Sequence, residues 1–191
     1  MDREMHCPLC AELGQDFYQD RRRHYLRCGR CLLVWVPPAF FLPPAAEKAE
    51  YDLHQNSPDD PAYRAFLGRL LVPLMRRLPA AASGLEFGCG PGPALAAMLR
   101  EAGHEVRLYD PFYFPDIDAL EGCYDFITAT EVVEHLHRPG AELQTLWSRL
   151  RPGGILGLMT KLVRDRDAFA KWHYKNDPTH VCFFSVETWN W

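Results

Sequence analysis

The spacing of apolar residues changes along the chain and predicts regions of different structure. Residues 1–36 contain two short strand-like runs, Tyr25–Arg27 and Leu32–Val36. Prolines follow directly and predict an extended linker, because proline fixes φ and lacks a backbone donor. In residues 45–78 apolar side chains recur at spacings of three and four, which predicts helix. Pro73 interrupts this pattern and predicts a kink or a split in the helix.

From residue 84 onward, short apolar runs alternate with helical ones. The predicted strands are Leu85–Phe87, Glu105–Tyr109, Tyr124–Ala129 and Ile155–Thr160. The predicted helices are Ala94–Ala102, Glu131–Leu136 and Glu142–Leu150, and Arg151–Gly154 is predicted to be a turn. This alternation favours an α/β fold in which right-handed crossovers join parallel strands and helices cover both faces of the sheet.

Composition limits the classes of function without choosing one. The chain has 191 residues, 48% apolar residues and a net charge of −4, which fits one main globular domain with a small module beside it. This acidic balance argues against nucleic acid as a partner, although the basic run Arg21–Arg23 leaves that contact open. The sequence has neither an apolar run that could cross a bilayer nor a signal peptide, so we expect a cytoplasmic protein with reduced thiols. The sequence does not determine the oligomeric state.

Four cysteines form two close pairs near the N-terminus, Cys7 with Cys10 and Cys28 with Cys31. Two C-x2-C pairs at this separation are typical of a structural zinc site, and the segment resembles a zinc ribbon. Four thiolates leave no open position on the metal, so the zinc would stabilise the fold. Disulfides and a redox C-x2-C pair are the alternatives. A reducing compartment disfavours disulfides, and a redox site would not need two C-x2-C copies.

A glycine-rich turn follows the first predicted strand of the α/β region. Gly88, Gly90 and Gly92 give the spacing G-x-G-x-G, which differs from the dinucleotide pattern G-x-G-x-x-G, and no P-loop pattern is present. Such a turn lies at the carboxyl end of its strand, where ligands bind in open parallel sheets. Asp110 closes the second predicted strand about twenty residues later, where an acid commonly binds ribose hydroxyls.

The run Leu-Glu-Phe-Gly-Cys-Gly-Pro-Gly at residues 85–92 resembles motif I of class I S-adenosylmethionine-dependent methyltransferases. The resemblance implies a Rossmann-like sheet that binds S-adenosylmethionine. It places Asp110 at the ribose, Glu86 near the amino group of the cofactor, and the backbone of Gly88 and Gly90 against the methionine part. The expected cofactor-binding residues are Glu86, Gly88, Cys89, Gly90, Gly92, Asp110, Thr130, Glu131, Tyr51 and His54.

The segment Thr130–Leu136 resembles the E-V-x-E-H segment that follows the fourth strand in many small-molecule methyltransferases. The resemblance implies that it borders the cofactor and the substrate entrance, with Glu131 as the site residue. Glu134 and His135 are equally compatible with structural roles. Tyr51 and His54 precede the glycine turn. They either line the site or have helix-capping and surface roles.

The segment Pro111–Gly122 departs from the family pattern, because it is too short for the usual helix and third strand. The acid that binds adenine therefore has only Asp116 and Asp118 as weak candidates. The chain also ends inside what resembles the helix before strands six and seven, so we expect those two strands to be absent.

His180 and Tyr174 are the candidate catalytic residues. They lie after the last predicted strand, in a segment that resembles part of the sugar C-methyltransferases, where histidine and tyrosine face the acceptor. Histidine titrates near neutral pH and suits the removal of a proton from an acceptor. The alternative is a buried histidine that orders its own loop.

These patterns together predict a zinc ribbon at 1–36, a linker with covering helices at 37–80 and a truncated S-adenosylmethionine-binding domain at 81–191. The expected function is methyl transfer to a small molecule with His180 as base. One alternative is a methyltransferase that acts on RNA or protein. The other is a module that retains the cofactor without turnover and uses Arg21–Arg23 for recognition.

Overall fold

The computed structural model describes residues 5–53 and 56–191, so His54 lies outside the described residues. The chain forms two compact units, each assembled from separate stretches of sequence. The cysteine unit contains Met1–Glu47, Val133–Leu143 and Thr160–Trp191. The parallel-sheet unit contains Lys48–Val132 and Gln144–Met159.

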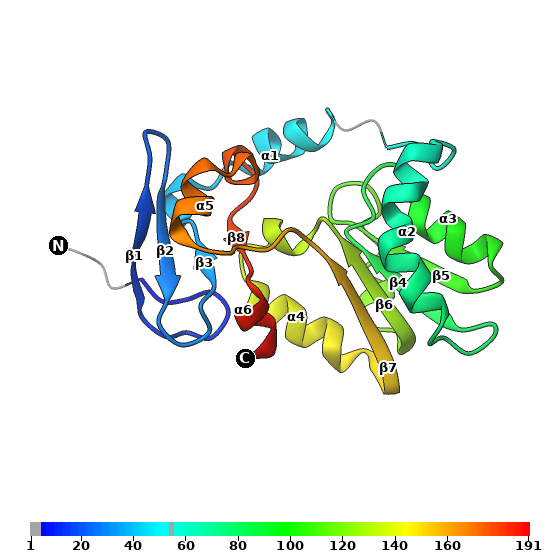
Figure 1. Ribbon diagram of the computed structural model, residues 1–191. Coiled ribbons are helices and arrows are strands. Elements are labelled where there is room, and N and C mark those ends of the chain that lie inside the picture. The colour runs from blue at the N-terminus through cyan, green and yellow to red at the C-terminus, as the bar shows by residue number, and fades with distance from the viewer. Residues whose placement is uncertain (1–4, 54–55) are drawn as a thin grey trace. The chain divides into compact units, whose positions relative to one another are not determined.

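The parallel-sheet unit is built on four parallel strands in the order β5-β4-β6-β7 (Figure 1). The strands are β4 (Ser83–Phe87), β5 (Glu105–Tyr109), β6 (Tyr124–Thr130) and β7 (Leu150–Met159). The predicted Rossmann-like sheet is therefore confirmed, and the described residues add no strand to it beyond β7. After β4 the chain goes to one side and then crosses to the other, so β4 lies at the switch point where such sheets bind ligands.

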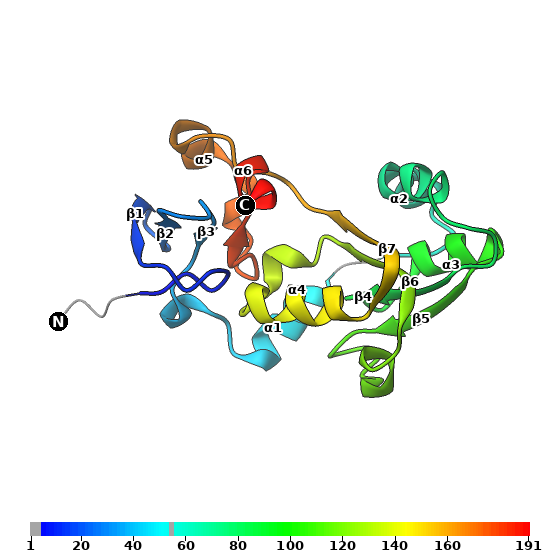
Figure 2. The same cartoon turned by 90° about the horizontal axis from the view of Figure 1, so that it is seen from below.

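Helices cover both faces of this sheet. On one face α2 (Pro61–Met75) and α3 (Ala94–Glu101) pack against the strands (Figure 2). This core contains Leu67, Leu74, Leu95, Leu99, Val106 and Phe126. On the other face η2 (Ile117–Leu120) and α4 (Pro139–Ser148) contribute to a second core, which contains Leu85, Ala119, Tyr124, Ile127 and Leu146. The two cores bury the two faces of the sheet, and the backbone pairing of the strands fixes their register.

The predicted helical region at 45–78 forms two helices, α1 (Pro44–Tyr51) and α2. The Asp60 side chain caps α2 by accepting a hydrogen bond from the backbone of Ala62. The helix continues through Pro73 and ends two residues later, so the split predicted there is wrong. A proline so near the end removes one hydrogen bond of the last turns while the apolar face of the helix stays packed.

Two local predictions in the α/β region need correction. Arg151–Gly154 was predicted to be a turn, but these residues lie inside β7. There the pairing with β6 jumps from Leu150 to Ile155, so the segment forms a bulge in which Gly153 has a φ of +80°. The helix predicted at Glu131–Leu136 is only one short 3-10 turn, η3 (Val133–His135). The short η2 in place of a full helix and a third strand agrees with the departure noted in the sequence.

The cysteine unit contains an antiparallel sheet in the order β1-β2-β3-β8 (Figure 1). Its strands are β1 (Gly14–Gln19), β2 (His24–Cys28), β3 (Val34–Trp35) and β8 (Cys182–Phe183). The two strands predicted in the N-terminal region correspond to β2 and β3. The unit also holds η1 (Pro38–Phe40), α5 (Arg166–Lys171), η4 (His173–Asn176) and α6 (Val186–Asn190). Across the described ranges, no helix has the length and apolar character needed to cross a membrane.

Candidate functional site

The glycine turn after β4 requires glycine at specific positions. Gly88 and Gly90 have φ angles of +70° and +62°, in the left-handed region that other residues rarely adopt. A Cβ on Gly92 would lie 1.9 Å from the carbonyl oxygen of Asn56, so only glycine allows this close approach. The amide of Gly88 donates to the carbonyl of Tyr109 at 2.7 Å, which holds the turn against the end of β5.

Asp110 connects this turn to the loop after β5. Its Oδ2 accepts a hydrogen bond from the amide of Gly90 at 2.9 Å. Its Oδ1 accepts from the amides of Phe112 at 2.9 Å and Tyr113 at 3.1 Å. A carboxylate has about four lone-pair positions, so three bonds leave capacity for one more donor. The structure therefore brings two predicted site residues, Asp110 and Gly90, into direct contact.

Glu86 lies on β4 and is 4% exposed. Its Oε2 accepts a hydrogen bond from the amide of Ala96 in α3 at 2.7 Å. Burial raises the pKa of Glu86 to about 7, although the bond from Ala96 acts in the opposite direction. Tyr63 of α2 is affected by the charge of Glu86 as well. Burial, together with the negative charges of Glu86 and Glu131, raises the pKa of Tyr63 to about 12. Tyr63 belongs to the same sequence cluster before the glycine turn as Tyr51, and the packing of α2 brings it near these charges.

The end of β6 has an unusual backbone. Thr130 is the last residue of the strand and pairs with Met159. Glu131 follows with a φ of +53°, which is rare for a residue other than glycine, and its amide donates to the carbonyl of Met159 at 2.8 Å. Strained conformations of this kind concentrate at functional sites. Both residues are partly buried, and their strand end lies at the same edge of the sheet as the ends of β4 and β5.

Other predicted cofactor residues lie on the elements around the turn. The ring of Tyr51, at the end of α1, lies 5.7 Å from the ring of Phe112 in the loop that Asp110 organises. Cys89 is buried inside the glycine turn, and burial raises the pKa of its thiol, so the thiol stays protonated. Asp116 forms an ion pair with Arg107 at 2.6 Å, outside this cluster of contacts.

The four N-terminal cysteines converge in the cysteine unit. Their Sγ atoms lie within 4.8 Å of one another, with 3.5 Å between Cys7 and Cys31 and 3.4 Å between Cys10 and Cys28. Tetrahedral zinc with bonds of about 2.3 Å separates its sulfurs by about 3.8 Å, so the donor set fits this metal. The amides of Arg30 and Cys31 donate to Cys28 Sγ at 3.3 and 3.4 Å. A hydrogen bond with Cys31 lowers the pKa of Cys7 to about 5.

The two predicted catalytic residues contact each other within the cysteine unit. His180 Nδ1 lies 2.7 Å from the backbone carbonyl of Tyr174, and both side chains are buried. His180 Nε2 lies 3.7 Å from Asp177 Oδ2. Burial lowers the pKa of His180, while the charge of Asp177 acts in the opposite direction. The imidazole is therefore held in its neutral form with the Nδ1 proton directed at a carbonyl.

Glu134 and His135, whose roles the sequence left open, contact Tyr174 and His180. The Tyr174 hydroxyl donates to Glu134 Oε1, and Glu134 is fully buried. His135 Nδ1 lies 3.2 Å from the carbonyl of Thr179, and its ring centre is 4.7 Å from that of His180. We call Glu134, His135 and His180 the histidine cluster. Only the Glu-His pair after a strand end indicated it in the sequence, because His180 is distant along the chain.

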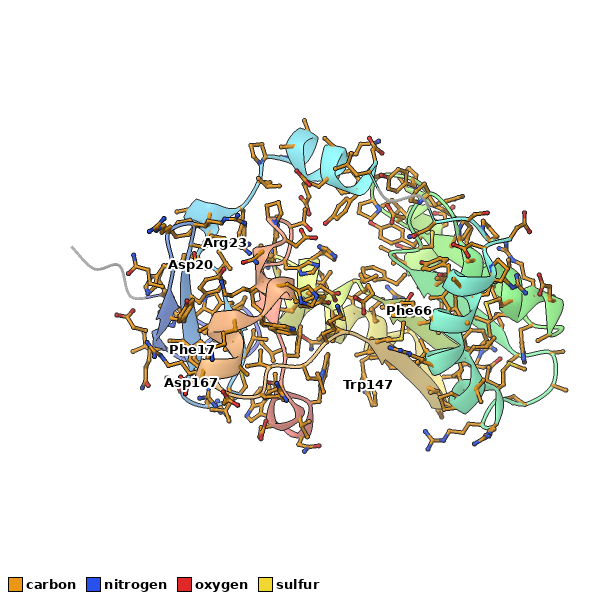
Figure 3. All side chains as sticks on the ribbon, turned by 45° about the horizontal axis from the view of Figure 1, so that its top comes forward. Phe17, Asp20, Arg23, Phe66, Trp147 and Asp167 are labelled. Carbon is orange, nitrogen blue, oxygen red and sulfur yellow. The ribbon has the colours of Figure 1, made fainter. Side chains whose placement is uncertain are left out.

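The basic run at residues 21–23 divides into two kinds of residue. Arg21 and Arg22 are exposed, whereas Arg23 is 7% exposed. Figure 3 labels Arg23 and Asp20, which lie together between β1 and β2. The Arg23 guanidinium donates to the backbone carbonyls of Lys175, Asp177, Pro178 and His180. Arg23 therefore fixes the segment that carries His180, and of this basic run only Arg21 and Arg22 are exposed.

Parts of this chain are similar to known proteins. A family described as "Methyltransferase domain" matches residues 60–191. Two ubiquinone biosynthesis O-methyltransferases are similar to part of the chain. The protein from Shewanella pealeana is 28% identical over 93 residues, which cover 49% of this chain and 39% of that protein. The protein from Pectobacterium atrosepticum is 30% identical over 87 residues, covering 46% and 36%. The chain thus spans less than half the length of these curated relatives.

Two solved structures align with part of the chain at low sequence identity. Coclaurine N-methyltransferase bound to N-methylheliamine and SAH aligns with a TM-score of 0.43 at 16% identity, covering 71% of this chain and 50% of that one. The CurJ carbon methyltransferase aligns with a TM-score of 0.42 at 18% identity, covering 69% and 46%.

Proposed function

Because the chain belongs to the methyltransferase domain family, we propose that it transfers a methyl group from S-adenosylmethionine to a small molecule. The observation that carries this proposal is the bond between Asp110 and the amide of Gly90 at the switch point of the sheet. It joins the glycine turn to the acid that ends the next strand, and this pair of elements binds nucleoside cofactors in Rossmann-like sheets.

We assign the remaining capacity of the Asp110 carboxylate to the ribose hydroxyls of the cofactor. The backbone around Gly88 and Gly90 would accept the methionine part, with Glu86 near its amino group. The ends of β6 and α1 would complete the site. Their proposed contacts are Thr130, Glu131 and Tyr51, and the sequence adds Cys89, Gly92 and His54.

The acceptor is proposed to be a small molecule with a group that loses a proton. The curated relatives are named as O-methyltransferases of ubiquinone biosynthesis, which favours a hydroxyl acceptor. When bound, S-adenosylmethionine supplies an electrophilic methyl group, so the protein's own task is to orient the acceptor and remove its proton. His180 is the candidate base, because burial favours its neutral form and the Tyr174 carbonyl directs the ring proton to Nδ1.

Calorimetry and methyl incorporation test this function separately. We expect S-adenosylmethionine to bind with a stoichiometry of one and NAD not to bind, since the turn lacks the dinucleotide spacing. Labelled methyl groups should then enter a metabolite fraction. Binding of NAD alone would refute the cofactor assignment. Labelling of RNA or protein, or cofactor binding with no labelled product in any fraction, would support one of the two alternative functions.

We also propose that the four cysteines hold one structural zinc ion. The convergence of the four sulfurs within 4.8 Å of one another and the two amide bonds to Cys28 support this assignment. Elemental analysis of the purified chain should find about one zinc per chain bound through these thiolates. Replacement of Cys28 with Ser should reduce that content, and replacement of the exposed Cys123 should not. A zinc content unaffected by the Cys28 variant would contradict the proposal.

A further inference from the structure

We propose that the histidine cluster binds a divalent transition-metal ion, at a site distinct from the four cysteines. Two ligands come from the short turn η3 and the third from the segment before β8, all within the cysteine unit. Each side chain places one donor atom within 4.8 Å of the other two. The amide of Val181 donates to the carbonyl of Glu134 at 2.8 Å, so the main chain itself fixes the two segments beside each other.

The hydrogen bonds of both histidines prepare them as metal ligands. His180 Nδ1 faces the carbonyl of Tyr174, and His135 Nδ1 faces the carbonyl of Thr179. A carbonyl only accepts, so each Nδ1 carries the proton and each lone pair is on Nε2. Metal-bound histidines have this arrangement, in which the second ring nitrogen donates to a carbonyl and fixes the tautomer. Two histidines that share it in one cluster point to a common ligand.

The carboxylate of Glu134 supplies the charge that a divalent ion requires. It is fully buried, and the Tyr174 hydroxyl orients it through Oε1. A carboxylate oxygen is a ligand that divalent transition-metal ions accept. Asp177 adds a second carboxylate near His180 Nε2, at 3.7 Å.

The donor types separate this site from the cysteine site. Two imidazole nitrogens and one carboxylate suit manganese, iron or zinc, whereas four thiolates select softer ions. Three protein ligands leave positions open on the metal for water or an acceptor oxygen. Metal binding is independent of the proposed methyl transfer. A role for the ion in lowering the pKa of an acceptor hydroxyl rests on that function, and there it would replace proton removal by His180.

Titration of the full, zinc-loaded chain with Mn²⁺ tests the site, because Mn²⁺ favours oxygen and nitrogen donors over the thiolates. Calorimetry should show one Mn²⁺ per chain. The variants His135→Asn and His180→Asn should each weaken binding by more than about tenfold. His173→Asn removes an exposed histidine from the same segment and should bind as the unaltered chain does. No binding at millimolar Mn²⁺, or wild-type affinity in both cluster variants, would overturn the proposal.

A second measurement does not depend on variants that may unfold. Pulsed electron paramagnetic resonance of Mn²⁺ on the unaltered chain labelled with ¹⁵N-histidine should show coupling to histidine nitrogen, and its absence would refute the site. Calorimetry with S-adenosylmethionine is run in parallel without Mn²⁺. If the unaltered chain binds S-adenosylmethionine but not Mn²⁺, only this inference is rejected. If it binds Mn²⁺ but not S-adenosylmethionine, only the proposed function is rejected.

Discussion

At the scale of single residues, Glu86 has the most informative titration. Its pKa rises from 4.5 to about 7 on folding, so the folded chain binds this proton more tightly than the unfolded chain. The corresponding stability is fully present below about pH 4.5 and is lost as the pH rises through about 7. Glu86→Gln removes the dependence, because the amide does not ionise.

We therefore expect the unaltered chain to lose about 3 kcal/mol of unfolding free energy relative to Glu86→Gln between pH 4 and pH 8. Urea unfolding of both proteins at several pH values measures the difference. Glu105→Gln changes an exposed glutamate and should follow the unaltered chain. Parallel curves for the unaltered chain and Glu86→Gln would contradict the assigned pKa.

Asp110 allows a graded test, because its two oxygens have different partners. Asp110→Asn keeps one oxygen that can accept from the loop after β5, whereas Asp110→Ala removes every acceptor. We expect the affinity for S-adenosylmethionine to fall more than about tenfold in Asp110→Ala, with a smaller loss in Asp110→Asn. Calorimetry measures both, with Glu121→Gln, a change at an exposed carboxylate outside the proposed site, as control. Equal affinity in all three variants would remove Asp110 from the site.

Sequence patterns assigned roles to some of these residues and left the roles of others open for a physical reason. Glycine spacing and the acid after the next strand are local signals, so Gly90 and Asp110 could be paired from the sequence. Tyr63 and His135 gain their surroundings only when α2 packs on the sheet and the segment before β8 lies beside η3. No local pattern records such long-range contacts.

At the scale of elements, the link between the β1–β2 turn and the segment before β8 rests on Arg23. Four backbone carbonyls accept from this one side chain, and Arg23→Met would leave them without that donor. We expect a loss of about 3 kcal/mol of unfolding free energy. Arg22→Met, at an exposed neighbouring position, should change it by less than about 0.5 kcal/mol. Chemical unfolding measures both variants, and equal losses would refute the role of Arg23.

The helices and strands show where the spacing of apolar residues was sufficient to predict an element and where it was not. Strands β4, β5 and β6 follow apolar runs and were predicted almost to their ends. The bulge in β7 was wrongly predicted to be a turn. Gly153 and Gly154 are residues typical of turns, but the pairing of β7 with β6 keeps them in the strand. Strand β8 has only two residues and exists through its partner β3, so no periodicity could indicate it.

At the scale of the whole molecule, each of the two units has its own candidate ligand. The cysteines lie in one unit and the glycine turn lies in the other. We expect calorimetric unfolding in two transitions. A zinc chelator should lower only the transition of the cysteine unit, and S-adenosylmethionine should raise only that of the parallel-sheet unit. A single transition that shifts as one with both ligands would contradict separate stabilities.

The pairing of β3 with β8 has a consequence for the order of events during synthesis. Val34 and Phe183 are about 150 residues apart, so β3 leaves the ribosome long before its partner exists. Until then the nascent chain exposes the unpaired edge of an apolar strand, which invites aggregation. Early capture of zinc by the four cysteines would hold β2 and β3 in place during this interval. Zinc-starved cells should therefore accumulate this protein in insoluble form.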